Sequence, residues 1–436
     1  QGGLECDAPQ WLGKFVANTR EQEGCRERQP EYQPPPEADR TESGAESQPQ
    51  AQRETDGPVA EDGGDHRRAG VAQPTEDADR VLDFTADLPA LPETLAGPAS
   101  GVRRPWLDGT DTRGSFVEAV AYDVAKDRST PVAAVSHGDH YVFQEDAHSA
   151  LRGVVQAFYF CSWMHDFFEQ LGFGALAGNL ERVGGDALLV RVRDTANVRR
   201  AWLVPAPDGQ RCVMFTGPDP DTGRNNALDP DTVFHEYVHA VTQRLVGGVR
   251  NVDVLREAQS AGLAEGWSDY FALSVQNALA MEPKDVLGSW VTNSAAGARS
   301  HPYNSRFTDH ATFGSIGSSG RTEPHQIGEI WAAILMQAQR ELLHAFPGNR
   351  ARSYALLWQI VYDSFVLLQA NPHFLEARDA MLTALGALKT SQHIDAHEFE
   401  MARGALWQAF AKYGMGSDAR CRGAGLTGIV EGRAIP

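Results

Sequence analysis

The chain has 436 residues, of which 42% are hydrophobic, so it is long enough to bury a large core and to hold two or three domains. Its formal net charge of −19 argues against nucleic acid as a partner, because binding to phosphates requires a basic surface. No run of about 18 apolar residues occurs, and we therefore expect no membrane span. The chain begins with Gln1 instead of methionine, and we expect the natural N-terminus, with any signal peptide, to lie upstream.

Residues 1–80 differ in composition from the rest of the chain. Between residues 30 and 79 the only large apolar side chains are Tyr32, Val59 and Val71, and most other positions are Pro, Glu, Asp, Gln, Arg, Gly or Ala. Such a segment buries too little apolar surface to offset the loss of chain entropy on folding. We interpret residues 1–80 as a disordered or linker segment, with an acidic interaction tail as the alternative.

A strand-rich lobe is expected over residues 81–230 and a helical lobe over residues 231–436. Short apolar runs typical of strands occur at 116–122, 140–143, 187–193 and 211–215, and a helical pattern covers 147–171. Helical patterns then follow at 231–246, 258–281, 325–346, 350–369, 373–387 and 395–413, with Gly and Pro near their ends. These patterns predict an α+β fold in which a cleft forms where the two lobes meet.

The segment His235-Glu236-Tyr237-Val238-His239 begins the helical lobe. Histidines four residues apart lie on one face of a helix, where both imidazoles can bind one metal ion. Glu236 can reach a water molecule beside that ion, as the general base of zinc peptidases does. The five-residue pattern is a weak signal by itself, because short patterns arise by chance in a long chain.

Glu265 supplies the third ligand that a hydrolytic zinc site requires. Asp269 follows it by four residues on the same helix face and can accept the spare N–H of a zinc-bound histidine. Asp231, four residues before His235, is a second candidate for that role. The alternative is that Glu265 and Asp269 are ordinary polar residues of a solvated helix. We disfavour it because they flank an apolar set that should be buried.

The cysteines do not form a disulfide framework, because they are odd in number and scattered. Pairing of Cys6 with Cys25, or of Cys212 with Cys421, remains open for an oxidising compartment, and Cys161 is expected to be a buried free thiol. A group of four aspartates could hold calcium, although we favour a solvated loop: Asp219, Asp221, Asp229 and Asp231.

Several separate stretches resemble the fungalysin-type metallopeptidases, which are relatives of thermolysin. The resemblance covers roughly residues 81–436, and its order and spacing are highly specific. It is carried by residues 157–159, 164–167, 171–173, 178–179, 207–210, 235–239, 265–269, 325–332 and 409–416. It implies a thermolysin-like, two-lobed α+β fold with the zinc site between the lobes.

The resemblance also implies roles for single residues. His235, His239 and Glu265 match the ligands of one Zn²⁺ per chain, Glu236 matches the catalytic base, and Asp269 matches the carboxylate that bonds a zinc-bound histidine.

Two further residues match the family, and each of them has an alternative interpretation. His325 matches a histidine that hydrogen-bonds the tetrahedral intermediate, and its alternative is a histidine held by packing near Trp331. Arg299 resembles an arginine that binds the substrate carbonyl, and its alternative is a surface salt bridge.

The implied activity is that of a secreted, monomeric metalloendopeptidase, made as a zymogen, that acts on protein or peptide substrates. Residues 1–80 are too short and too polar to be recognised as the family's folded prosegment, although they could be its remnant. The chain also departs from the family's pattern at Ser162, at Ala240 and at Arg200, which replaces part of an asparagine-rich edge segment. Arg200 puts the contacts to the substrate backbone in doubt, whereas none of the three changes a zinc ligand.

Two other functions remain possible on the same fold. A zinc aminopeptidase would need an acidic anchor for the substrate amine, and no Gly-x-Met-x-Asn segment precedes the zinc helix. A binding module without activity would not require Glu236, which is intact.

Overall fold

The computed structural model of the protein describes residues 106–107, 110–137, 140–143, 150–181, 186–197, 200–280, 283–318 and 320–436. The linker expected over residues 1–80 and the possible pair of Cys6 with Cys25 lie outside the described residues.

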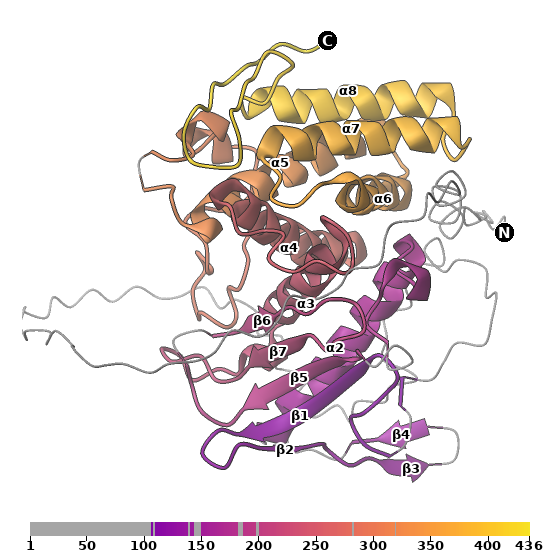
Figure 1. Cartoon of the computed structure of the whole chain (residues 1–436), viewed down its shortest axis with the longest axis vertical. Helices are drawn as coiled ribbons and strands as arrows, with labels where there is room; N and C mark the ends of the chain where they lie inside the picture. Colours follow the sequence, from indigo (N-terminus) through magenta and orange to yellow (C-terminus); the bar gives the residue numbers. More distant parts are fainter. Residues whose placement is uncertain are drawn as a thin grey trace, which may run out of the picture. The chain divides into compact units, whose positions relative to one another are not determined.

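The strands of the first part form a five-stranded sheet in the order β2-β1-β5-β7-β6 (Figure 1). β1, β5 and β7 are parallel in the middle, whereas β2 and β6 are antiparallel at the edges. The bounds are Val117–Asp123 for β1, Arg128–Thr130 for β2, Leu188–Arg193 for β5, Trp202–Val204 for β6 and Val213–Thr216 for β7. A separate pair joins β3 (Val135–His137) to β4 (His140–Val142). The four expected strand regions are confirmed, and the sequence patterns missed β2, β3 and β6.

Helix α2 (Ala150–Leu171) packs against β1 and β5. Its buried positions include Val154, Phe158 and Cys161, which follow each other at intervals of three or four residues, as one face of a helix requires. β5 alternates in the same way with a period of two, because Val190 and Val192 are buried whereas Arg191 is partly exposed. This layer of helix and sheet forms the core of the strand-rich part.

The second part contains only helices as regular elements among the described residues (Figure 1). Each of the six helices expected from the sequence is present to within a few residues, and the α+β class is confirmed. Asp229 caps the first of them by accepting a hydrogen bond from the backbone of Asp231, and Pro230 occupies its first position. The helices are α3 (Pro230–Leu245), α4 (Ala258–Leu279), α5 (Pro324–Ala345), α6 (Arg350–Leu367), α7 (Phe374–Thr390) and α8 (Ala396–Lys412).

Glycines allow α4 and α5 to approach each other closely. A Cβ atom on Gly266 would lie 2.7 Å from the carbonyl oxygen of Gly328, and one on Gly328 would lie 2.5 Å from Cβ of Glu265. Neither position can therefore carry a side chain without displacing backbone. Glu265 projects from α4 at this contact. His325 lies at the start of α5, one turn before Gly328.

Cys161 and Cys212 are buried free thiols, and Cys421 is also free. The expectation for Cys161 is confirmed, and the possible pair of Cys212 with Cys421 is not formed. Burial without a nearby cation raises the pKa of the Cys161 thiol well above its usual range. No helix in the described part of the chain is long and apolar enough to cross a membrane.

Candidate metal centre and active site

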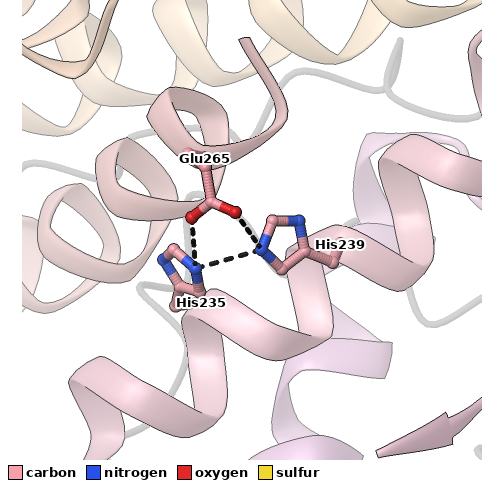
Figure 2. A group of neighbouring side chains, drawn as sticks. All are labelled: His235, His239 and Glu265. Carbon is pink, nitrogen blue, oxygen red and sulfur yellow. Dashed lines mark hydrogen bonds and ion pairs between the residues drawn. The ribbon is translucent and has the colours of Figure 1, made fainter. Parts of the chain in front are cut away.

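Two helices bring three possible metal ligands together (Figure 2). His235 and His239 lie one turn apart on α3, and Glu265 projects toward both from α4. Nε2 of His235 is 3.0 Å from Nε2 of His239 and 3.2 Å from Oε2 of Glu265. Nε2 of His239 is 3.6 Å from Oε1 of Glu265. The chosen ligand atoms all lie within 4.8 Å of one another, which is the arrangement of two imidazoles and one carboxylate around a single ion.

The charges in this group fit a bound cation. Burial raises the pKa of Glu265, but His239 and His235 lower it by a larger amount. The pKa of this carboxyl is therefore well below its usual range. Burial lowers the pKa of His235, but Asp269 and Glu265 raise it to about 10, whereas burial lowers the pKa of His239 to about 4. The group therefore attracts one positive charge. Oε2 of Glu265 is buried and lies 3.2 Å from Nε2 of both His235 and His325, so ring nitrogens surround this carboxylate oxygen.

Asp269 fixes the orientation of the first histidine. Its Oδ1 lies 2.7 Å from Nδ1 of His235, and its carboxylate accepts two hydrogen bonds from Arg299, at 2.7 and 2.8 Å, and one from Tyr303. Burial raises the pKa of Asp269, but Arg299 and His235 lower it far below its usual value. An ionised Asp269 can only accept, so Nδ1 of His235 carries a proton, and Nε2 is the ring atom left to face His239 and Glu265.

Glu236 points into the same cleft without being one of the three grouped ligands. Its side chain is buried, and burial raises its pKa to about 7, although His235 lowers it. The backbone N–H of Leu203 in β6 donates to this carboxylate. A carboxyl group with a pKa near neutrality, beside a possible metal ion, is suited to exchange protons with water.

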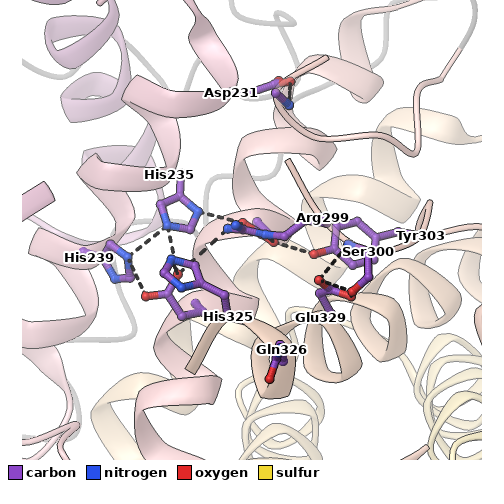
Figure 3. Close-up of polar contacts among 12 residues, drawn as sticks. Asp231, His235, His239, Arg299, Ser300, Tyr303, His325, Gln326 and Glu329 are labelled. Carbon is purple, nitrogen blue, oxygen red and sulfur yellow. Dashed lines mark hydrogen bonds and ion pairs between the residues drawn. The ribbon is translucent and has the colours of Figure 1, made fainter. Parts of the chain in front are cut away.

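His325 lies beside the three possible ligands (Figure 3). Its side chain is 58% exposed. Its Nε2 lies 3.2 Å from Oε2 of Glu265, and burial lowers its pKa. The imidazole therefore stands at the side of the cleft, where it can reach a bound molecule.

Arg299 lies 12% exposed beside Asp269 and also lines the cleft. The salt bridge that was the alternative for this residue is present, but it is a buried bidentate pair with Asp269 and not a surface contact. Arg299 also borders the cleft, so its position is compatible with contact to a substrate.

Asp231 lies apart from the two histidines (Figure 3). Its carboxylate accepts from Lys284, Gln276 and the backbone of Gly288. The side chain thus joins the start of α3 to the segment after α4, and the structure does not bring it to the metal ligands as Asp269 is brought.

The other aspartates of the possible calcium group are also bonded to N–H donors. Asp219 and Asp221 both pair with Arg200, and Asp229 accepts from the backbone of Asp231 and Val291. Among the described residues, these aspartates do not bring three ligand atoms close together. Calcium therefore gains no support from these contacts.

The three possible ligands face a cavity of about 720 Å³ between β6 and the segment that follows α4. One wall is formed by residues at and before the edge strand, including Arg200, Trp202 and Leu203. The opposite wall includes the apolar side chains of Leu287 and Val291. Arg200 is held by Asp219 and Asp221, so its charge is compensated at the cavity wall. A cleft of this size with one apolar wall can hold several residues of an extended peptide.

Some functional contacts had no signal in the sequence. Tyr303 and the backbone of Leu203 reach Asp269 and Glu236 only because the segments that carry them fold against α3 and α4. Ser300 donates from its backbone and its hydroxyl to Glu329 of α5, which fixes the segment next to Arg299. No spacing or composition rule could have found these contacts.

The family model for fungalysin metallopeptidase (M36) matches residues 69–419 of the chain. The extracellular metalloproteinase mep of Aspergillus fumigatus is 30% identical over 305 residues, which are 64% of this chain and 46% of the relative. Extracellular metalloproteinase 2 of Arthroderma gypseum is 30% identical over 288 residues, or 61% of this chain and 44% of the relative. Extracellular metalloproteinase 3 of Trichophyton soudanense is 30% identical over 302 residues, which are 63% of this chain and 73% of the relative. The chain thus matches about half the length of the first two relatives.

Proposed function

Because the chain belongs to the fungalysin metallopeptidase family, we propose that it is a secreted, zinc-dependent endopeptidase that hydrolyses peptide bonds in proteins. The observation that carries the proposal is the convergence of His235, His239 and Glu265 at one wall of a cleft, with Glu236 beside them. The two imidazole nitrogens lie 3.0 Å apart, which suits two ligands of one ion.

His235, His239 and Glu265 would hold the zinc ion, and Asp269 keeps His235 in the tautomer that can bind it. Bound there, zinc would supply Lewis-acid chemistry, which polarises a scissile carbonyl and lowers the pKa of water. Arg299 keeps Asp269 ionised and presents its guanidinium to the substrate at the cleft wall.

Glu236 acts as the general base and then as the general acid. As a carboxylate it takes a proton from the attacking water, and it later delivers that proton to the leaving amine. The buried position that raises its pKa to about 7 makes the carboxyl a stronger base than an exposed glutamate. His325 donates a hydrogen bond to the oxyanion that develops on the substrate, a contribution typically worth about 3 kcal/mol of barrier.

The substrate lies along β6, which is the edge strand of the five-stranded sheet. An extended peptide adds to such an edge through backbone hydrogen bonds, so the register of the main chain determines which bond reaches Glu236. Leu287 and Val291 line the cleft opposite β6 and favour a large apolar side chain beside the cleaved bond.

Secretion is supported by the names of the relatives, which describe them as extracellular. Its substrates are proteins and peptides, and we expect a monomer that is made as a zymogen. The family and the names of the relatives do not favour the two alternatives, a zinc aminopeptidase and an inactive binding module.

A zymogram on casein or gelatin tests the proposal. The purified protein should clear the substrate, a zinc chelator should abolish clearing, and added zinc should restore it. Clearing that a chelator does not affect, or no clearing by the folded and zinc-loaded protein, would contradict the proposal. Digestion of a defined peptide then separates internal cleavage from the removal of N-terminal residues.

A further inference from the structure

A second group of possible metal ligands lies on α2, outside the cleft. His165, Asp166 and Glu169 each offer one ligand atom, and these atoms lie within 4.8 Å of one another. His165 and Glu169 are four residues apart and share a face of the helix. Nδ1 of His165 is 3.2 Å from Oδ1 of Asp166, which is close to the separations among the three ligands in the cleft.

The ring of His165 is fixed in place. Its side chain is 1% exposed, and it stacks on Phe116 with ring centroids 3.7 Å apart and planes 14° apart. Asp166 is held as well, because its other oxygen accepts a hydrogen bond of 3.0 Å from Nε1 of Trp106. Both side chains are therefore oriented before any ion binds.

The surroundings of Nε2 of His165 bear on which partner Nδ1 has. Nε2 is buried, has no hydrogen-bond partner and lies 4.0 Å from Oε1 of Glu181, which also accepts from Asn179. A neutral ring has one proton for two carboxylates, because Asp166 lies beside Nδ1 and Glu181 lies on the side of Nε2. In either tautomer one ring lone pair faces a carboxylate unless a cation lies between them.

One proton on Nδ1 would satisfy Asp166 alone, whereas Glu169 adds a second carboxylate at the same point. We propose that His165, Asp166 and Glu169 bind a second divalent cation, of the class that accepts mixed imidazole and carboxylate ligands, with zinc as the first choice. In this arrangement Glu181 lies behind the histidine at 4.0 Å, farther than the 2.7 Å that separates Asp269 from His235. The ion takes no part in hydrolysis. It fixes the two α2 side chains that contact Trp106 and Phe116 and so stabilises the strand-rich part.

Metal analysis of the whole chain tests this second site. The protein is dialysed against micromolar zinc, freed of unbound metal by gel filtration and analysed for zinc. The parent should carry two ions per chain and the double variant Asp166→Asn/Glu169→Gln one, with unchanged cleavage of casein. These substitutions remove charge but keep shape, and Glu169 is exposed, so the variant should fold. Glu400→Gln, at an exposed position of α8, is the matched control and should keep two ions.

The cleft variant His239→Ala separates the two sites. It should lose activity and keep one ion per chain, and the triple variant with Asp166→Asn and Glu169→Gln should keep none. If the parent carries a single ion that His239→Ala removes, the second site is wrong and the proposed function stands. If a single ion survives His239→Ala but not the double variant, the second site stands and the cleft assignment is wrong. Two ions retained by the double variant would also overturn the second site.

Discussion

Oδ1 of Asp269 lies 2.7 Å from Nδ1 of His235, and this contact determines which nitrogen of the histidine faces the cleft. Arg299 and Tyr303 hold the same carboxylate from other directions, so its position does not depend on the histidine alone. The contact connects the fold of the segment after α4 with the affinity of the proposed zinc site.

Replacement of Asp269 by asparagine should weaken zinc binding by about 10–100-fold, because the amide no longer raises the basicity of His235. Competition with a chromogenic chelator measures this affinity. Asp231→Asn is a matched control, because Asp231 is also buried but bonds Lys284 and Gln276. It should leave zinc affinity within about threefold of the parent. Zinc affinity in Asp269→Asn equal to that of the parent would contradict this role of Asp269.

His325→Ala should lower kcat by about 100-fold while KM changes little, because the lost hydrogen bond forms only in the transition state. Steady-state kinetics on an internally quenched peptide separate the two constants. His344→Ala, an exposed position near the other end of α5, should keep the kcat of the parent. An equal kcat in His325→Ala and His344→Ala would favour the alternative that His325 is held only by packing.

The pH profile of kcat/KM should have an acid limb with a midpoint at or below about 7. Burial raises the pKa of Glu236 to about 7, and a cation in the adjacent site lowers it by favouring the carboxylate. The base acts in its deprotonated form, so activity is lost as the pH falls through this value. Zinc content is measured at each pH, and a flat profile down to pH 4 in folded, zinc-loaded protein would contradict the role of Glu236 as base.

Asp363 should make the protein less stable at high pH. Burial raises its pKa to about 7, against a single hydrogen bond from Gln359 that lowers it. Because the pKa is raised in the folded state, the proton on Asp363 contributes fully to the free energy of unfolding below about pH 4. This contribution is lost as the pH rises through 7. The difference of about three units corresponds to about 4 kcal/mol at most.

Asp363→Asn stays neutral at every pH and should therefore gain thermal stability relative to the parent between pH 4 and pH 8. Thermal midpoints are compared in a Glu236→Gln background, which prevents self-digestion. Asp379→Asn, at an exposed position of α7, serves as the control and should follow the parent. Parallel curves for the parent and Asp363→Asn would show that Asp363 is already solvated in the folded state.

The helical part and the proximity of His235 to His239 could be predicted from the sequence because both depend on the 3.6-residue period. His235 and His239 share a face by spacing alone, and Glu265 lies within a long apolar helical pattern. The short strands carry no such period. β2 has three exposed residues, and β6 has three residues that are paired only with β7, so neither shows the alternation that predicts a strand.

Asp231 shows where helical spacing alone is insufficient. It precedes His235 by one turn, but the segment of Lys284 and Gly288 lies against the start of α3 and satisfies its carboxylate. Arg299 and Tyr303 reach Asp269 from a region whose only regular elements among the described residues are short 3₁₀ turns. Contacts of this kind depend on how irregular segments fold, and no periodic pattern records them.

Glu236→Gln tests the central claim most directly, because the substitution keeps the size of the side chain but cannot accept a proton from water. We predict that the variant retains the zinc content of the parent, because Glu236 is not among the proposed ligands, and that cleavage of casein falls by several orders of magnitude. Metal analysis and a casein assay on the same preparation give both values. Activity equal to that of the parent, or loss of zinc together with activity, would contradict the account of Glu236 as the base of a zinc endopeptidase.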